Sequence, residues 1–133
     1  MKIICVGQNY LEHIKELSNV KSKEPLVFLK PDTALISKGR SFFIPNFSKE
    51  IHYELEVVIK IKKPGRYIER KYSNQYYDEI TVGIDFTARD LQKKLREKGH
   101  PWEKSKGFDG STLVGNFLNK NDLPPISNLN FHL

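Results

Sequence analysis

Hydrophobic and acidic residues alternate through residues 51–59, which is the period of a β-strand, and the strand is predicted to extend to residue 61. Shorter apolar runs at residues 2–6, 26–29 and 80–87 predict three more strands, of which the first and last are buried. Residues 42–45 are also apolar and predict another short strand. The pattern therefore indicates a fold that is rich in β-structure.

Helical spacing occurs at two places in the chain. Apolar residues recur at three-residue intervals after Asn9, which is a suitable N-cap, and predict a helix that ends near Asn19. Residues 90–98 predict a second, amphipathic helix that is closed by Gly99. Pro101 begins a further short turn or helix.

The composition fits one domain with a core, because the chain has 133 residues and 38% of them are hydrophobic. A net charge of +6 permits nucleic acid or small anions as partners, but the basic residues are spread along the chain without a nucleic-acid-binding motif. Cys5 is the single cysteine, which favours a reducing compartment. No apolar run approaches the length of a membrane span. We therefore expect a cytoplasmic protein without nucleic-acid or membrane partners.

Two carboxylates, Glu54 and Glu56, fall on one face of the longest predicted strand, roughly 6.5 to 7 Å apart. They are either part of a solvated strand face or ligands of a metal ion. Asp85 lies in an otherwise apolar strand, where an unpaired carboxylate is costly to bury, and would supply a third ligand, although a turn or capping role competes. Oxygen-only ligation favours Mg²⁺ or Mn²⁺ over zinc.

Other polar residues are weaker candidates on the pattern alone. His13 and Glu16 share a face of the first predicted helix, where the carboxylate could orient the imidazole as a general base, but a solvated helix face competes. Lys106 could hold an anionic substrate, although most lysines are surface residues. His52 is either a partner of the glutamates or a polar residue on their face.

Five ordered segments resemble successive motifs of the fumarylacetoacetate hydrolase family. They are CVGQNY (5–10) followed by His13, FLKP (28–31), HYELE (52–56), GIDFTARD (83–90) and WEKSKGFD (102–109). Their order and spacing also match, from Ile3 to about Gly115. The resemblance implies an α+β fold that is mainly β, a mixed β-sheet roll with short flanking helices. It also implies that residues 1–133 form the N-terminal portion of a single catalytic domain.

The resemblance assigns roles to particular residues. It makes Glu54, Glu56 and Asp85 the ligands of a catalytic Mg²⁺ or Mn²⁺, with Ca²⁺ as a non-physiological occupant. Lys106 and Gln92 would lie at the substrate. Arg89 would support substrate binding. His13 and Glu16 would form the dyad that activates water, on a short helix that closes over the site.

The implied activity is that of a metal-dependent hydrolase that cleaves a carbon–carbon bond in a small 2-oxo acid, such as an acylpyruvate, through an enolate. Oxaloacetate decarboxylation and isomerisation or hydration of hydroxyheptadienedioate are the alternatives within the family. Family members commonly form homodimers, so a homodimer is expected.

Two departures from the family pattern bear on these expectations. Gln8 stands where the motif usually has arginine, which removes a bidentate cation near the lid. The Gly-Thr-Pro-Gly type loop of the family has no match before Leu133. The domain is therefore expected to be truncated at its C-terminus, as a fragment or as a member completed by another chain. An inactive metal-binding remnant and a basic nucleic-acid-binding module are the alternatives from other classes.

Overall fold

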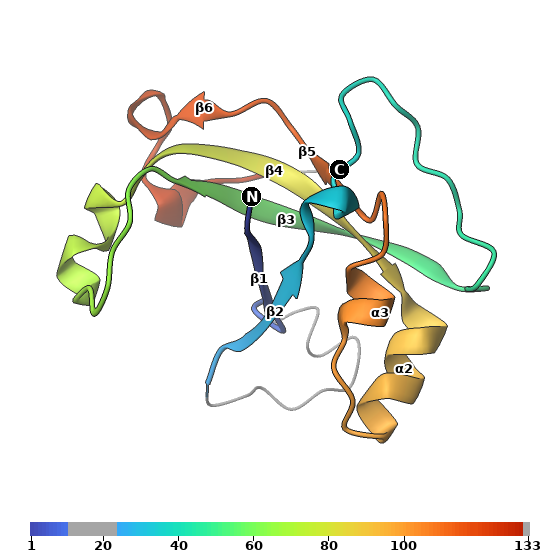
Figure 1. Cartoon of the computed structure of the whole chain (residues 1–133). Helices are drawn as coiled ribbons and strands as arrows, with labels where there is room; N and C mark the ends of the chain where they lie inside the picture. The colour runs from blue at the N-terminus through green and yellow to red at the C-terminus, as the bar shows by residue number, and fades with distance from the viewer. Residues whose placement is uncertain (11–23, 132–133) are drawn as a thin grey trace.

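The computed structural model describes residues 1–10 and 24–131 (Figure 1). The helix predicted between Asn9 and Asn19 lies mostly outside these residues, as do His13 and Glu16. In the described part of the chain no helix is long and apolar enough to cross a membrane.

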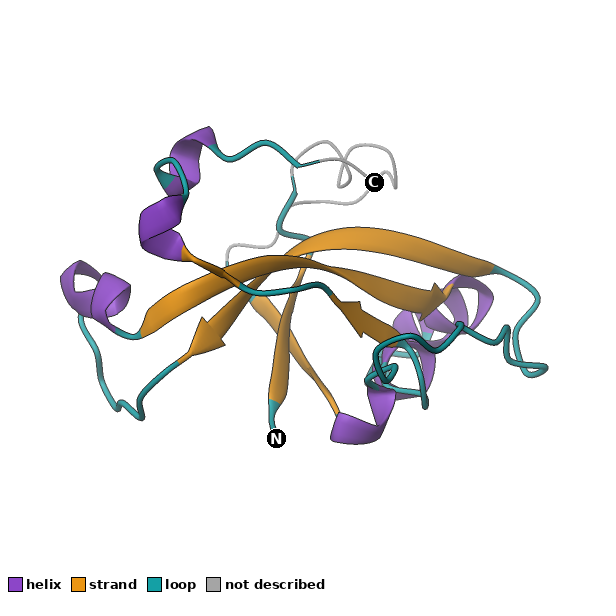
Figure 2. Cartoon of the chain, turned by 90° about the horizontal axis from the view of Figure 1, so that it is seen from above, coloured by secondary structure: helices purple, strands orange, loops and turns teal. Residues whose placement is uncertain are grey.

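The main sheet is antiparallel and is built on two long strands, β3 (Ile51–Ile61) and β4 (Tyr77–Ala88). Two short strands, β5 (Thr112–Val114) and β6 (Leu118–Asn119), pair with the other edge of β4. Figure 2 shows β3 and β4 side by side, with short helices near both ends of the pair. The alternation of apolar and polar residues in residues 51–61 therefore predicted β3 correctly.

A second sheet consists of β1 (Ile3–Gly7) and β2 (Leu26–Lys30), which pair antiparallel with Ile3 opposite Lys30. Phe28 and Lys30 are two apart, so they share the inner face of β2, and both are buried. Val27 and Leu29 on the other face are more than half exposed. A lysine thus occupies an inward position in a strand that is otherwise apolar.

Two helices follow β4 closely. The first, α2 (Arg89–Glu97), begins directly where β4 ends, one residue before the predicted start. The second, α3 (Glu103–Lys106), is a single turn after Pro101, as the sequence suggested. The described residues also contain four 3₁₀ helices, which span Asp32–Ala34, Arg70–Gln75, Lys120–Asp122 and Ile126–Asn128. The fold is α+β and mainly sheet, as predicted.

The prediction of a strand at residues 42–45 was wrong. These residues form a loop without strand pairing. Phe42 stacks on Phe86 with ring centroids 3.8 Å apart, whereas Phe43 and Ile44 are 81% and 75% exposed. The apolar run therefore provides one aromatic anchor for a loop and has no neighbouring strand to pair with.

Candidate active site

The pairing of β3 with β4 brings two of the predicted ligands together. Glu54 lies directly opposite Asp85, and Glu56 lies opposite Gly83. Directly opposed residues of an antiparallel pair point to the same face, so the three carboxylates share one side of the sheet. Gly83 leaves room there, because a Cβ at this position would lie 2.8 Å from the carbonyl oxygen of Leu113.

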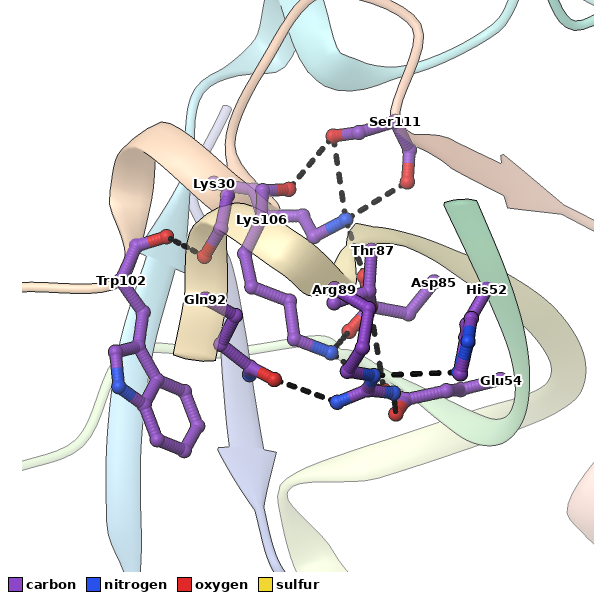
Figure 3. Close-up of polar contacts among 11 residues, drawn as sticks. Lys30, His52, Glu54, Asp85, Thr87, Arg89, Gln92, Trp102, Lys106 and Ser111 are labelled. Atoms are coloured by element: carbon purple, nitrogen blue, oxygen red, sulfur yellow. Dashed lines mark hydrogen bonds and ion pairs between the residues drawn. The ribbon is translucent and has the colours of Figure 1, made fainter. Parts of the chain in front are cut away.

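Lys106 reaches this face from α3, at the edge of the sheet (Figure 3). Its ammonium lies 2.7 Å from Asp85 Oδ2 and also forms an ion pair with Glu54 Oε2. The residue is only 3% exposed. A lysine that the pattern alone would place at the surface is therefore a buried cation that bridges two carboxylates.

Arg89 is the second buried cation, at the first position of α2. It forms an ion pair with Glu54 Oε1, donates a 2.5 Å hydrogen bond from Nη1 to Gln92 Oε1 and donates from Nε to His52 Nδ1 at 3.3 Å. Gln92 is buried too. Each oxygen of Glu54 thus faces a cation, and His52 is a neighbour of the arginine that holds this carboxylate, as Figure 3 shows.

Glu54 and Glu56 differ in how far nearby cations offset the effect of burial on their pKa values. Burial would raise the pKa of Glu54, but the charges of Lys106 and Arg89 outweigh it and lower the pKa to about 2. For Glu56, burial raises the pKa, the charges of Glu54 and Asp85 add to this effect, and the pKa reaches about 7. Nearby cations therefore favour the ionised form of Glu54, whereas for Glu56 burial and the neighbouring acids outweigh them and favour the protonated form.

Lys30 also belongs to the site, and we did not predict it from the sequence. Its ammonium lies 2.7 Å from Asp85 Oδ1 and donates to the carbonyl oxygen and the Oγ of Ser111 at 2.8 and 3.2 Å. Burial lowers the pKa of this lysine, while the neighbouring Asp85 opposes the shift. The available signal was the lysine at an inward position of an apolar strand, next to Pro31.

The donor set fits a divalent metal ion. Three carboxylates on one face are the hard oxygen ligands that Mg²⁺ and Mn²⁺ prefer. Burial raises the pKa of Glu56, and the charges of Glu54 and Asp85 add to this effect; a cation bound beside Glu56 would oppose both and favour its ionised form. As the side chains lie, no three acidic, histidine or cysteine residues of the described part of the chain are grouped as ligands around one point. Glu54 and Asp85 instead converge on Lys106.

The structure thus joins most of the candidates from the sequence in one network. Glu54, Asp85, Arg89, Gln92 and Lys106 are connected by ion pairs and hydrogen bonds. Glu56 adjoins this network on β3 and interacts with it through charge. The predicted dyad of His13 and Glu16 lies outside the described residues.

Comparison with known proteins identifies the class. The family model described as "Fumarylacetoacetate (FAA) hydrolase C-terminal" matches residues 2–133. The bovine protein named "Oxaloacetate tautomerase FAHD1, mitochondrial" is 34% identical over 131 residues, which are 98% of this chain and 59% of that protein. "Oxaloacetate tautomerase YcgM" of Escherichia coli strain K12 is 36% identical over 117 residues, 88% of this chain and 53% of that protein.

A solved structure gives the same result. The fumarylpyruvate hydrolase of Pseudomonas aeruginosa, solved in complex with Mn²⁺ and pyruvate, superposes with a TM-score of 0.82 and is 34% identical. That alignment covers 91% of this chain and 54% of the other. Fold and site thus define a relative of enzymes that act on small acids.

This chain belongs to the fumarylacetoacetate hydrolase family. It spans between half and three fifths of the length of the curated relatives cited above.

Proposed function

We propose that this protein is a Mg²⁺- or Mn²⁺-dependent enzyme that forms the enolate of a small 2-oxo acid. The observation that carries the proposal is the buried Lys106, which bridges Glu54 and Asp85 on a face that also holds Glu56. The Mn²⁺ and pyruvate bound by the Pseudomonas relative support the choice of metal and substrate class.

The ligands would be Glu54, Glu56 and Asp85, and the ion would supply Lewis acidity toward the carboxylate and keto oxygens of the acid. Lys106 would provide a positive charge in a site from which water is largely excluded, where it stabilises a developing negative charge more strongly than in water. Arg89 would keep Glu54 ionised and oriented through the ion pair at Oε1, and Gln92 would fix the guanidinium in turn.

Keto–enol tautomerisation of oxaloacetate is the first candidate reaction. It requires that a proton leave the carbon beside the keto group and that the keto oxygen gain one, or the reverse, with the enolate between the two forms. The names of the bovine and Escherichia coli relatives support it. Decarboxylation of oxaloacetate would instead form the enolate of pyruvate by loss of CO₂, and protonation of its carbon would give pyruvate.

Hydrolytic cleavage of an acylpyruvate is the second candidate, and the similarity to the fumarylpyruvate hydrolase supports it. It requires a base that activates water for attack on the second carbonyl carbon. His13 and Glu16 are proposed for this role from the family motif. Isomerisation or hydration of hydroxyheptadienedioate would use the enolate without hydrolysis.

A substrate panel tests the proposal. The rates of oxaloacetate tautomerisation and of acetylpyruvate cleavage would be followed by ultraviolet absorbance, with Mg²⁺, with Mn²⁺ and with a chelator. We expect metal-dependent turnover of at least one substrate and its loss in Glu54→Ala. Lys38→Ala, an exposed site on the loop before β3, serves as the matched control. Turnover in the presence of the chelator, or an unchanged rate in Glu54→Ala, would refute the mechanism.

We also propose a homodimer, as in other members of the family. Sedimentation equilibrium over a range of concentrations measures this directly, and a monomer at all concentrations would contradict it.

A further inference from the structure

The ammonium of Lys30 is held in place by Ser111. It donates to the carbonyl oxygen of Ser111 at 2.8 Å and to its Oγ at 3.2 Å, and its side chain is 1% exposed. Its contact with Asp85 Oδ1 is an ion pair at 2.7 Å. Lys30 is therefore held from two sides, by Ser111 and by the carboxylate of Asp85.

The two oxygens of Asp85 face two different lysines. Oδ1 faces Lys30, whereas Oδ2 accepts from Lys106 at 2.7 Å. Lys106 also forms an ion pair with Glu54, so it lies between two of the proposed ligands. Lys30 contacts the other oxygen of the Asp85 carboxylate, on the side of Ser111 (Figure 3).

We propose that Lys30 is a positioning residue. Its ion pair occupies Oδ1 of Asp85, so that Oδ2 is the oxygen available to bind a metal ion. The inference rests on the proposed metal site. A metal ion held by Glu54 and Asp85 would take the place of Lys106 beside these carboxylates, while Lys30 would remain at Ser111. Asp85 would then offer one oxygen instead of two.

A one-oxygen ligand affects which metal ion the site prefers. Ca²⁺ takes six to eight oxygens and often uses both oxygens of a carboxylate, whereas Mg²⁺ requires a near-octahedral shell. By blocking two-oxygen binding, Lys30 makes the site select Mg²⁺ against Ca²⁺. The positive charge of Lys30 would weaken both ions alike, because both are divalent, so charge alone does not alter their ratio.

Titration calorimetry of the 133-residue chain with Mg²⁺ and with Ca²⁺ tests this inference. The variants are Lys30→Met, which keeps the length of the side chain and removes the ammonium, and Ser111→Ala, which removes only the Oγ anchor. Lys38→Met is the matched surface control, since Lys38 is exposed and hydrogen-bonded to Asn116. Circular dichroism establishes that each variant is folded.

We expect the ratio of the Ca²⁺ to the Mg²⁺ dissociation constant to fall about tenfold in Lys30→Met, in the range for partners that orient metal ligands. Ser111→Ala should shift the ratio less, in the same direction, and Lys38→Met should leave it unchanged. The electron paramagnetic resonance spectrum of bound Mn²⁺ should also change in Lys30→Met as the ligand shell changes.

If the Mg²⁺ and Ca²⁺ dissociation constants of folded Lys30→Met change by the same factor, the inference is overturned, but the proposed metal site is not. If Lys30→Met does not fold, an unchanged ratio in Ser111→Ala would overturn it. Failure of the wild-type chain to bind any of the three ions would instead overturn the proposed metal site.

Discussion

Replacing Glu56 by glutamine is predicted to stabilise the metal-free protein at pH 8. The pKa of Glu56 is about 7 in the folded chain, against an ordinary value of 4.5, because burial and the charges of Glu54 and Asp85 favour the protonated form. The folded state therefore binds this proton more tightly than the unfolded state. The free energy of unfolding falls as the pH rises from about 4.5 to 7 and is level above that.

The difference in pKa corresponds to about 3 kcal/mol for a fully buried group. Glu56 is partly exposed, and solvent screening reduces the figure to about 2 kcal/mol. Glutamine keeps the size and one acceptor oxygen of the side chain but has no charge. At pH 8 Glu56→Gln should therefore be more stable than the wild type by about 2 kcal/mol, and at pH 5 the two should differ by less than about 1 kcal/mol.

Urea denaturation with a chelator, at pH 5 and pH 8, measures both differences. Comparing the variant with the wild type at each pH cancels the other titrating groups. Excess Mg²⁺ at pH 8 provides a second test, since an ion bound at 100 times its dissociation constant adds about 2.7 kcal/mol to the wild type and less to a variant that lacks a ligand charge. A variant less stable than the wild type at pH 8 without metal, or a gap that does not depend on pH, would refute the reasoning.

Three further predictions concern the same strands. Glu54→Ala should lower the free energy of unfolding by about 3 to 5 kcal/mol in urea denaturation, because the buried Arg89 and Lys106 lose their shared anion; a loss below 1 kcal/mol would contradict this. The pKa of Glu54 is lowered from 4.5 to about 2, so its ionised form stabilises the folded state above pH 4.5, and this stabilisation is lost as the pH falls to 2. The free energy of unfolding of the wild type should show this loss in an acid titration, and that of Glu54→Ala should not. Gly83→Ala should lower the free energy of unfolding by about 1 to 3 kcal/mol, because its Cβ would press on the backbone of Leu113; an unchanged urea midpoint would argue against this contact.

Period and residue type were enough to predict β3, α2 and the carboxylate face, because these features depend on local periodicity, of two residues in the strand and of about 3.6 in the helix. Residues 51–61 were predicted as one strand and form one strand. The short strands β5 and β6 were not predicted, since each contains two or three residues and exists only through its pairing with β4. The apolar residues 42–45 were misassigned for the converse reason, because they have no pairing partner.

The site residues also divide into those that a local pattern predicts and those whose role depends on tertiary contacts. The strand pattern predicted where Glu54 and Asp85 lie but left competing roles open for both, and the family resemblance then assigned them to one site; the structure places them opposite each other. Lys30 could not be predicted, because its role arises from an ion pair with a residue 55 positions away and from hydrogen bonds to Ser111, 81 positions away. Burial of a lysine is visible only when the surrounding elements are in place.

The register of β3 and β4 has a consequence for how this chain tolerates insertions and deletions. Glu54 opposes Asp85 in a ladder that runs without interruption from Ile51 to Lys60, and its irregularity lies beyond that, between Lys60 and Ile61. A one-residue insertion on the site side of this irregularity would move one acid to the opposite face of the sheet. The connection from residue 63 to 75 lies beyond the irregular end of the ladder and beyond the backbone hydrogen bond from Lys62 to Tyr76, so a change in its length need not alter the register of the paired acids. In related sequences, insertions and deletions should therefore occur in that connection and be absent between the irregularity and the site.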